Sequence, residues 1–302
     1  MNYSILKYIL GYVLKIEAAF MLLPCVTSLI YHEKEGRYFF LVACVCMLLG
    51  VLMTYRKPKN TVFYLKEGCL ATSLSWIILS LFGAIPFWIS GEIPQWENAL
   101  FETISGFTTT GATVLSNVEG LSHTALIWRS FTHWIGGMGV LVFLLAILPL
   151  SGGSSINLMR AESPGPSVGK LVPKVRYTAM ILYTIYFGMT VIEFIFLLAG
   201  KMPVFDALTT AFGTAGTGGF GIKNDSIMGY SPYIQWVVAI FMILFGINFN
   251  FYFYILYRHF RKAISMEEIH YYLAMILIAV TIIFLNVRTM YPTGFEAMTH
   301  SV

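Results

Sequence analysis

Charge is scarce in this chain. Only 11% of its 302 residues are Asp, Glu, Lys or Arg, whereas 57% are hydrophobic and the mean hydropathy is +0.73. A water-soluble globular domain of this length does not tolerate such a composition. The scarcity of charge excludes the soluble class and predicts an all-α polytopic membrane protein.

Motifs of catalysis and cofactor binding are lacking as well. The sequence has no glycine-rich phosphate loop, no dinucleotide fingerprint, no catalytic pair of acids, no nucleophile with a base and no metal cluster. We therefore expect that the protein is not an enzyme and that this chain binds no cofactor. A cleavable signal-peptide pattern is also missing, so we expect the first apolar segment to stay as a membrane helix. The few cysteines lack metal-ligand spacing and are predicted to be free, buried thiols: Cys25, Cys44, Cys46 and Cys69.

The sequence consists mostly of long apolar windows. Those able to cross roughly 30 Å of hydrocarbon predict about seven spans, at 8–30, 38–54, 68–90, 124–149, 178–199, 232–257 and 270–287. The loops on one side of these spans carry eleven Lys and Arg, against five on the other side. This bias predicts a cytoplasmic N-terminus. From residue 91 to residue 121 there are four Glu and no Lys or Arg, a charge pattern that would concentrate cations at an outer mouth.

A polar, threonine-rich run, 101–120, lies between two apolar windows. We interpret it as a pore loop, in which a short helix over about 96–107 enters the membrane and an extended stretch returns. Non-helical backbone at that depth must line water or be buried in protein. Backbone carbonyls and Thr hydroxyls can replace the hydration shell of a monovalent cation, and glycine lets successive carbonyls turn toward one axis. The alternative for this run alone is an ordinary turn between two membrane helices. We name it the first Thr/Gly segment and expect it to be a selectivity filter: Thr109, Thr110, Gly111 and Ala112.

The pattern recurs. At Phe205 the chain again reads Phe, an acid, two residues and Ser/Thr, followed by a Gly/Thr-rich run. Aligning Gly219 with Gly111 implies about four extra residues in the second pore helix. The Phe-and-acid pattern appears a third time at 295–299. Internal repeats of helix, pore loop and helix are hard to get by accident, which favours a filter over a turn. The second Thr/Gly segment is Thr217, Gly218, Gly219 and Phe220.

Two charged residues flank the first Thr/Gly segment. Glu102 lies in the expected pore helix and Arg129 in the second turn of the following helix, which predicts an ion pair that braces the loop. A direct role for Arg129 in an ion path is less favoured, because a fixed positive charge would repel the ion. His123 and His133 are interpreted as structural or solvated rather than as proton carriers.

Other polar residues lie within the expected spans, where charge is costly. We interpret Lys15 as a snorkelling lysine and Glu17 as a locally paired glutamate. For Glu193 a structural hydrogen bond is slightly favoured over a place in an ion vestibule.

Four stretches resemble the TrkH/KtrB superfamily of bacterial potassium uptake proteins: FETISGFTTTGATVL, LIWRSFTHWIGGMGVLVFLLAILP, MRAESPGP…KLVPKVRYTA and TGGFG. They lie within about 96–220, and the long loop of the third stretch favours the TrkH branch. Members of the family carry four unequal helix, pore-loop, helix repeats around one ion path in a single polypeptide. Asn248 and Asn250 resemble the family's Asn-Phe pair and are expected to cap or bend their helix. The resemblance implies potassium transport, with potassium at Thr109, Thr110, Gly111, Thr217, Gly218 and Gly219.

The resemblance also implies where the protein is located and which partners it binds. We expect a bacterial inner-membrane protein that contacts lipid, forms a homodimer and binds no nucleic acid. A cytosolic nucleotide-binding regulatory subunit is the implied partner. Since only two Thr/Gly segments are present, we expect the N-terminal part of a transporter. A sodium-dependent, KtrB-like transporter and a non-conducting membrane scaffold are the alternatives. The expected organisation is an N-terminal helix pair (1–60), a first repeat (61–150), a cytoplasmic connector (151–177), a second repeat (178–262) and the start of a third repeat (263–302).

Overall fold

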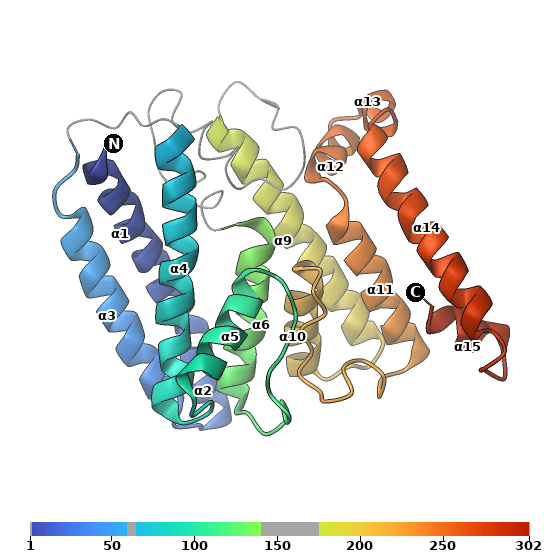
Figure 1. The fold of residues 1–302 in the computed structure, drawn as a ribbon, viewed down its shortest axis with the longest axis horizontal. Coiled ribbons are helices and arrows are strands. Elements are labelled where there is room, and N and C mark those ends of the chain that lie inside the picture. Colours follow the sequence, from blue (N-terminus) through green and yellow to red (C-terminus); the bar gives the residue numbers. More distant parts are fainter. Residues whose placement is uncertain (1, 59–64, 140–174, 302) are drawn as a thin grey trace.

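The structure is a computed structural model that describes residues 2–58, 65–139 and 175–301. Each regular element in these ranges is a helix, and the axes of the long helices lie roughly parallel or antiparallel to one another (Figure 1). The all-helical architecture that the composition predicted is confirmed for the described residues. The helices are α1 (Tyr3–Phe20), α2 (Leu22–Tyr31), α3 (Gly36–Thr54), α4 (Leu65–Ser90), α5 (Trp96–Phe107), α6 (His123–Met138), α9 (Val175–Ala199), α10 (Val204–Ala215), α11 (Pro232–Gly246), α12 (Phe249–Leu256), α13 (Phe260–Ile264), α14 (Glu267–Val287) and α15 (Gly294–Thr299).

Five described helices are long and apolar enough to cross a membrane, and a sixth span results if the bent pair α11 and α12 counts as one. Five of the seven expected windows fall on these five helices. The first span, Tyr3–Tyr31, is longer than expected because α2 continues α1 beyond Met21. The window 124–149 begins with α6, and its part after 139 lies outside the described residues.

The window 232–257 differs from the expected single straight span. It consists of α11 and α12, which meet at 89°. Ile247 is extended (φ −73°, ψ 138°), and the Asn248 side chain caps α12 by accepting a hydrogen bond from the Asn250 N–H at 3.0 Å. A capped new helix start at this point ends the first helix and turns the chain. The prediction that Asn248 caps or bends the helix is confirmed.

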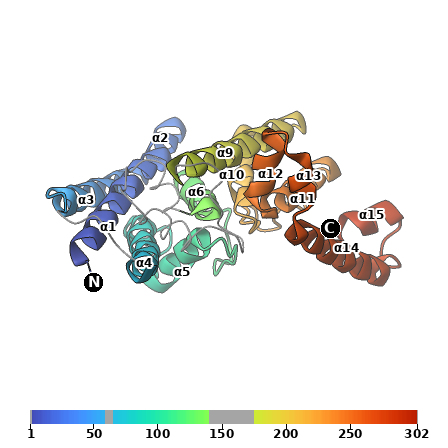
Figure 2. The same ribbon diagram turned by 90° about the horizontal axis from the view of Figure 1, so that it is seen from above.

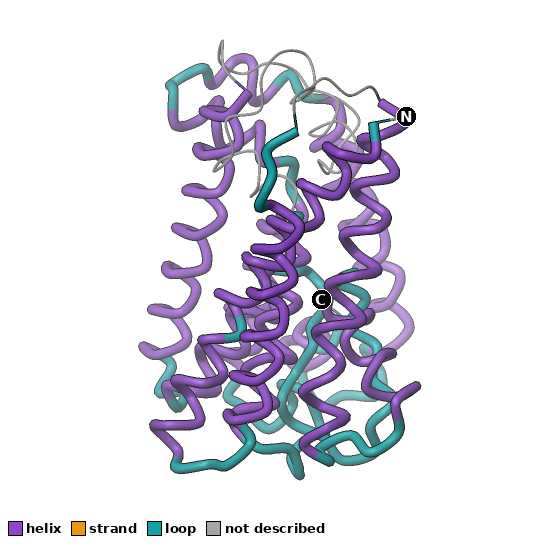
Figure 3. The backbone as a smooth tube through the Cα atoms, turned by 90° about the vertical axis from the view of Figure 1, so that its left-hand side faces the viewer, coloured by secondary structure: helices purple, strands orange, loops and turns teal. Residues whose placement is uncertain are grey.

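Helices α4, α5 and α6 form one three-helix motif, and α9, α10 and α11 form a second. In each motif the middle helix has 12 residues, beginning at Trp96 in α5 and at Val204 in α10. The two are equally long, so the prediction of about four extra residues in the second pore helix is wrong. Its cause was the alignment of Phe205 with Phe101, which is out of register. Most of the loop backbone lies in one half of the bundle (Figure 3).

The N-terminal helices are tied to the first repeat by Glu33, in the turn between α2 and α3. Glu33 Oε1 lies 2.9 Å from both the backbone N and the Nδ1 of His123, and Oε2 accepts hydrogen bonds from the backbone N–H (2.9 Å) and hydroxyl (2.6 Å) of Thr124. Burial acts to raise the pKa of Glu33, but the hydrogen bonds from Thr124 and His123 outweigh it and lower the pKa. A carboxylate here also matches the positive end of the α6 dipole. Glu33 therefore fixes the start of α6.

The outside of the bundle is apolar. Leu29 is 75% exposed and Phe187 59% exposed, as expected where lipid replaces water around the helices. The four cysteines are free, as predicted, but the predicted burial holds only for Cys46: Cys25 is half-buried, and Cys44 and Cys69 are exposed on this surface. An apolar thiol is as compatible with lipid as with a protein core, which hydropathy alone does not distinguish.

Helices α14 and α15 stand at one edge of the bundle (Figure 2). Only 6% of the apolar window of α14 is buried inside the structure. The short helix α15 contacts α11, where the Trp236 ring stacks on Phe295 and its Nε1–H donates to Thr299 Oγ1 at 3.0 Å. The third Phe-and-acid pattern thus forms a helix that docks on the second repeat.

Candidate functional site

The two Thr/Gly segments have the same backbone conformation. The first follows α5, with positive φ at Thr109 (54°) and Gly111 (73°); the second follows α10, with positive φ at Thr217 (58°) and Gly219 (64°). Positive φ is uncommon for threonine and costs free energy unless the surrounding structure enforces it. The same Thr-x-Gly pattern of left-handed residues therefore marks two equivalent backbone turns. Both glycines therefore take left-handed backbone, which glycine adopts without strain.

The segments also lie against each other. A Cβ atom on Gly111 would overlap the carbonyl oxygen of Gly218, and a Cβ atom on Gly218 would lie 2.8 Å from the carbonyl oxygen of Thr109. Bare glycine backbone is required where the chains approach this closely. Backbone oxygens of both segments are thus brought together at one place between the repeats.

Each segment begins with hydrogen bonds to the short helix that precedes it, α5 or α10. In the first segment, the Thr110 N–H donates to the Ser105 carbonyl at 2.9 Å, and the Ser105 hydroxyl donates to the Ala112 carbonyl at 2.6 Å. In the second, the Thr217 N–H donates to the Thr214 carbonyl at 2.8 Å. These bonds satisfy backbone groups that would otherwise be unpaired inside a membrane protein. They also fix the direction in which the segments leave the helices.

A cavity of about 250 Å³ lies beside the segments and is lined by Thr109 and Thr217. Its remaining wall comes from α6, the end of α10, the break between α11 and α12, and Glu268 of α14. Thr109 and Thr217 occupy equivalent positions in the two segments. The cavity thus continues from the place where the two segments meet.

Glu102 and Arg129 lie next to both segments and are paired. Arg129 Nε donates to Glu102 Oε2 at 2.9 Å, with side-chain exposures of 2% and 0%. Glu102 Oε1 accepts from the Thr113 hydroxyl at 2.6 Å and from the Val114 N–H at 2.7 Å. The carboxylate therefore holds the chain just beyond the first Thr/Gly segment.

Arg129 extends this contact to the second segment. Its NH1 group donates to the Gly221 carbonyl at 2.7 Å, and its guanidinium carbon lies 3.3 Å from the centroid of the Phe220 ring. A cation over an aromatic ring gains electrostatic energy, more so when both are shielded from water. The pair thus links both segments, whereas the sequence predicted a brace for the first alone. Nothing in the sequence marks Gly221 as the partner, because it lies 92 positions from Arg129.

His133 packs behind the second segment. Its ring stacks on Phe220 with centroids 5.1 Å apart, and a Cβ atom on Gly216 or Gly218 would overlap it. Neither ring nitrogen has a hydrogen-bond partner among the described residues. Of the two interpretations open from the sequence, structural or solvated, the burial of His133 favours the structural one.

Two further acids are buried in the helices. Glu17 and Glu193 are each 0% exposed. Among the described residues, neither acid has a hydrogen-bond partner for its carboxyl oxygens. The local partner expected for Glu17 and the structural hydrogen bond favoured for Glu193 are therefore not found. The expected snorkelling residue Lys15 places its Nζ 4.8 Å from the centroid of the Tyr12 ring.

Comparison with known proteins gives consistent matches. The family model TrkH, described as "Cation transport protein", matches residues 35–296. The Trk system potassium uptake protein TrkH of Salmonella typhimurium is 36% identical over 263 residues, covering 85% of this chain and 54% of the relative. TrkG of Escherichia coli K12 is 31% identical over 89% of this chain and 56% of its own length.

A solved structure matches the whole chain. The crystal structure of the potassium transporter TrkH from Vibrio parahaemolyticus superposes with a TM-score of 0.84 and 27% identity, covering 100% of this chain and 63% of that one. An uncharacterized cation transporter of Methanocaldococcus jannaschii is 32% identical over 80% of this chain. The chain spans about half the length of the relatives that it matches.

Proposed function

The chain belongs to the TrkH family of cation transport proteins, and we propose that it forms part of a potassium uptake pathway across the cell membrane. The observation that carries the proposal is the pair of equivalent Thr/Gly segments, whose left-handed Thr-x-Gly turns bring backbone oxygens of two repeats together above a cavity. Carbonyl oxygens that replace a hydration shell are the known chemical basis of potassium selectivity. Relatives named as potassium uptake proteins support the choice of ion.

The two segments supply the ion ligands in this proposal. Oxygens of the first segment would come from Thr109, Thr110 and Gly111, and those of the second from the equivalent residues 217–219. Ala112 and Phe220 end the two segments. Glu102 and Arg129 hold the segments at a fixed separation and do not touch the ion.

The orientation follows from charge. The end of the bundle that holds Glu33 and the loops around 91–95 and 224–231 would face outward, and the end with α13 would face the cytoplasm together with the N-terminus. Helix α13 contains Arg261 and Lys262, and Arg258 lies just before it. This placement agrees with the positive-inside rule. The membrane would be a bacterial inner membrane. A cytosolic nucleotide-binding subunit and a second copy of the protein would be its partners there.

The test is rubidium uptake under sodium competition, with Gly219→Ala as the variant. A Cβ atom at Gly219 meets only Met242 Cε, at an ordinary 3.5 Å, so the change acts through φ alone. Left-handed backbone costs a residue with a Cβ about 1–2 kcal/mol, and about 1.4 kcal/mol changes a selectivity ratio tenfold. We expect sodium to compete up to about tenfold better in the variant. The matched control is Gly188→Ala, in a helix and with open space around its Cβ position. Equal sodium competition in both variants would contradict the proposal.

A further inference from the structure

The break between α11 and α12 frees backbone carbonyls, and α14 helps to satisfy them. The Ile243 carbonyl accepts a hydrogen bond from the Tyr272 hydroxyl of α14 at 3.1 Å. The Leu244 carbonyl accepts one from the Tyr252 hydroxyl at 2.6 Å and one from the Ile247 N–H. A broken membrane helix persists only where such partners replace the lost helical bonds. The start of α14 is therefore held against the break.

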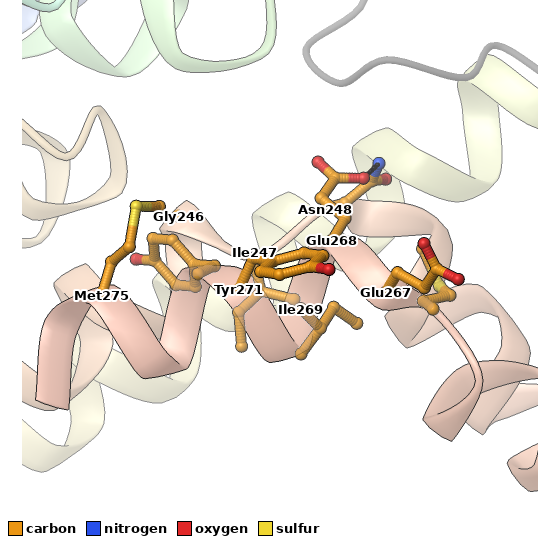
Figure 4. A pocket seen from close by; sticks show the side chains of 10 residues that line it. Gly246, Ile247, Asn248, Glu267, Glu268, Ile269, Tyr271 and Met275 are labelled. Carbon is orange, nitrogen blue, oxygen red and sulfur yellow. Dashed lines mark hydrogen bonds between the residues drawn. The ribbon is translucent and has the colours of Figure 1, made fainter.

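The same contact brings a carboxylate to the break. Asn248 uses both ends of its amide: Oδ1 caps α12, and Nδ2 donates to Glu268 Oε2 at 3.0 Å. Figure 4 shows the side chains of Asn248 and Glu268 next to each other, with Glu267 further along the helix. Glu268 lies in the first turn of α14 and is partly exposed.

Glu268 lines two cavities of the structure. The cavity of about 250 Å³ runs from Thr109 and Thr217 to Asn248 and Glu268. A larger pocket of about 750 Å³, drawn in Figure 4, shares Glu268 with this cavity and is also lined by Glu267. Among the described residues that line the smaller cavity, Glu268 is the charged one. Glu267 lines the larger pocket but not the smaller cavity.

We propose that Glu268 forms a monovalent-cation site in the cavity beside the Thr/Gly segments, where its carboxylate holds a hydrated ion that has entered or left them. The inference rests on the proposed potassium pathway and adds the residue that sets the cation concentration at its inner end. A cavity with one sign of charge and low-dielectric walls raises the local concentration of counter-ions about 10- to 1000-fold. The hydrogen bond from Asn248 fixes the carboxylate but is neutral, and among the described residues no Lys, Arg or His forms an ion pair with Glu268.

The decisive variant is Glu268→Gln in the protein as its cell makes it. Glutamine keeps an oxygen for Asn248 Nδ2, so the support of the helix break is retained while the charge is lost. Glu268→Asp keeps the charge, and Glu267→Gln removes a charge from the same helix turn without touching the smaller cavity. The three variants thus separate charge in this cavity from charge nearby and from the hydrogen bond.

The first measurement is rubidium flux into inverted vesicles, whose cytoplasmic face is outside, and its block by tetraethylammonium added to the bath. We expect Glu268→Gln to weaken both this flux and its block about tenfold, at the low end of the focusing effect, and Glu267→Gln to leave both within about twofold of the wild type. Glu268→Asp should keep most of the block. Equal block in the two glutamine variants would overturn the inference while leaving the proposed pathway intact.

The second measurement does not depend on transport. Rubidium that binds the folded protein raises its unfolding temperature in detergent by mass action, and choline at equal ionic strength serves as the reference. We expect the rubidium-dependent rise to shrink in Glu268→Gln and to persist in Glu267→Gln. If wild-type vesicles take up no rubidium, the proposed function fails, and this shift alone then decides whether the cation site exists. An unchanged rise in Glu268→Gln would refute the site.

Discussion

Replacing Glu102 by Gln tests whether the buried ion pair organises both Thr/Gly segments. The change removes the negative charge but almost no volume. Three donors now converge on the carboxylate: Arg129 Nε, the Thr113 hydroxyl and the Val114 N–H. An amide offers one oxygen and one NH2 group to these donors, so at least one is left without an acceptor. Arg129 then keeps its charge at 2% side-chain exposure without an anion beside it.

The expected loss of unfolding free energy follows from the burial of this ion pair. Breaking a buried pair by removing one partner costs roughly 3–5 kcal/mol, since the remaining charge is uncompensated. Arg129→Met should cost a similar amount, because it strands Glu102 and removes the bond to the Gly221 carbonyl. The double variant contains no buried charge at this place. We therefore expect its loss of unfolding free energy to fall short of the sum of the single losses by about 2–3 kcal/mol.

The assay is unfolding of the purified protein in mixed micelles, followed by helix content, for the wild type, both single variants and the double variant. Glu97→Gln is the matched control: it lies on the same pore helix, is exposed, and should change stability by no more than about 0.5 kcal/mol. Additive losses in the double variant would refute the coupling. A loss below about 1 kcal/mol in Glu102→Gln would mean that the pair is not buried from water in the membrane.

Two further predictions concern the contact of Glu33 with α6 and the proposed orientation. Because the pKa of Glu33 is lowered in the folded protein, its contribution to stability is present above the ordinary carboxyl pKa and is lost as the pH falls through the lower folded value. The difference in unfolding temperature between the wild type and Glu33→Gln should accordingly be full at pH 7 and shrink below about pH 4.5. For the orientation, cysteines introduced at Asn117 and Ser265 in a cysteine-free background should react with an impermeant thiol reagent from outside and from the cytoplasm, respectively; the reverse labelling would invert the proposed topology.

The sequence predicted the spans and the Thr/Gly segments because both depend on local signals. Hydropathy over 18 or more residues identifies a membrane helix without knowledge of its neighbours. The alignment of Gly219 with Gly111 was sound because glycine is the residue that takes left-handed backbone without strain, and the structure has positive φ at both. The cap at Asn248 was expected from the family resemblance, whereas the hydropathy window over 232–257 gave no sign of the break, because α11 and α12 are both apolar.

Contacts between distant parts of the chain could not be predicted in this way. Arg129 reaches Gly221, and Glu33 reaches His123, across about 90 positions. Glu268 meets Asn248 only because a helix break and the start of α14 coincide in space. A glutamate in the first turn of a helix looks the same in the sequence whether it faces lipid headgroups, water or a cavity.

The register of three short helices shows which local signal in the sequence should have been used. The helices α5, α10 and α15 begin at Trp96, Val204 and Gly294, and their fourth residues are Ala99, Ala207 and Ala297, each 0% exposed. The aromatic side chain of the Phe-and-acid pattern has no such fixed place, because Phe101 is the sixth residue of α5 whereas Phe205 and Phe295 are the second residues of their helices. Phe101 and Phe295 are 45% and 61% exposed, and Phe295 stacks on Trp236 at the surface, so burial in the core does not hold the aromatic residue to one helix position. A small residue is required where a short helix crosses its neighbours closely. The buried alanine therefore defines how α5, α10 and α15 align with one another, whereas the phenylalanine does not.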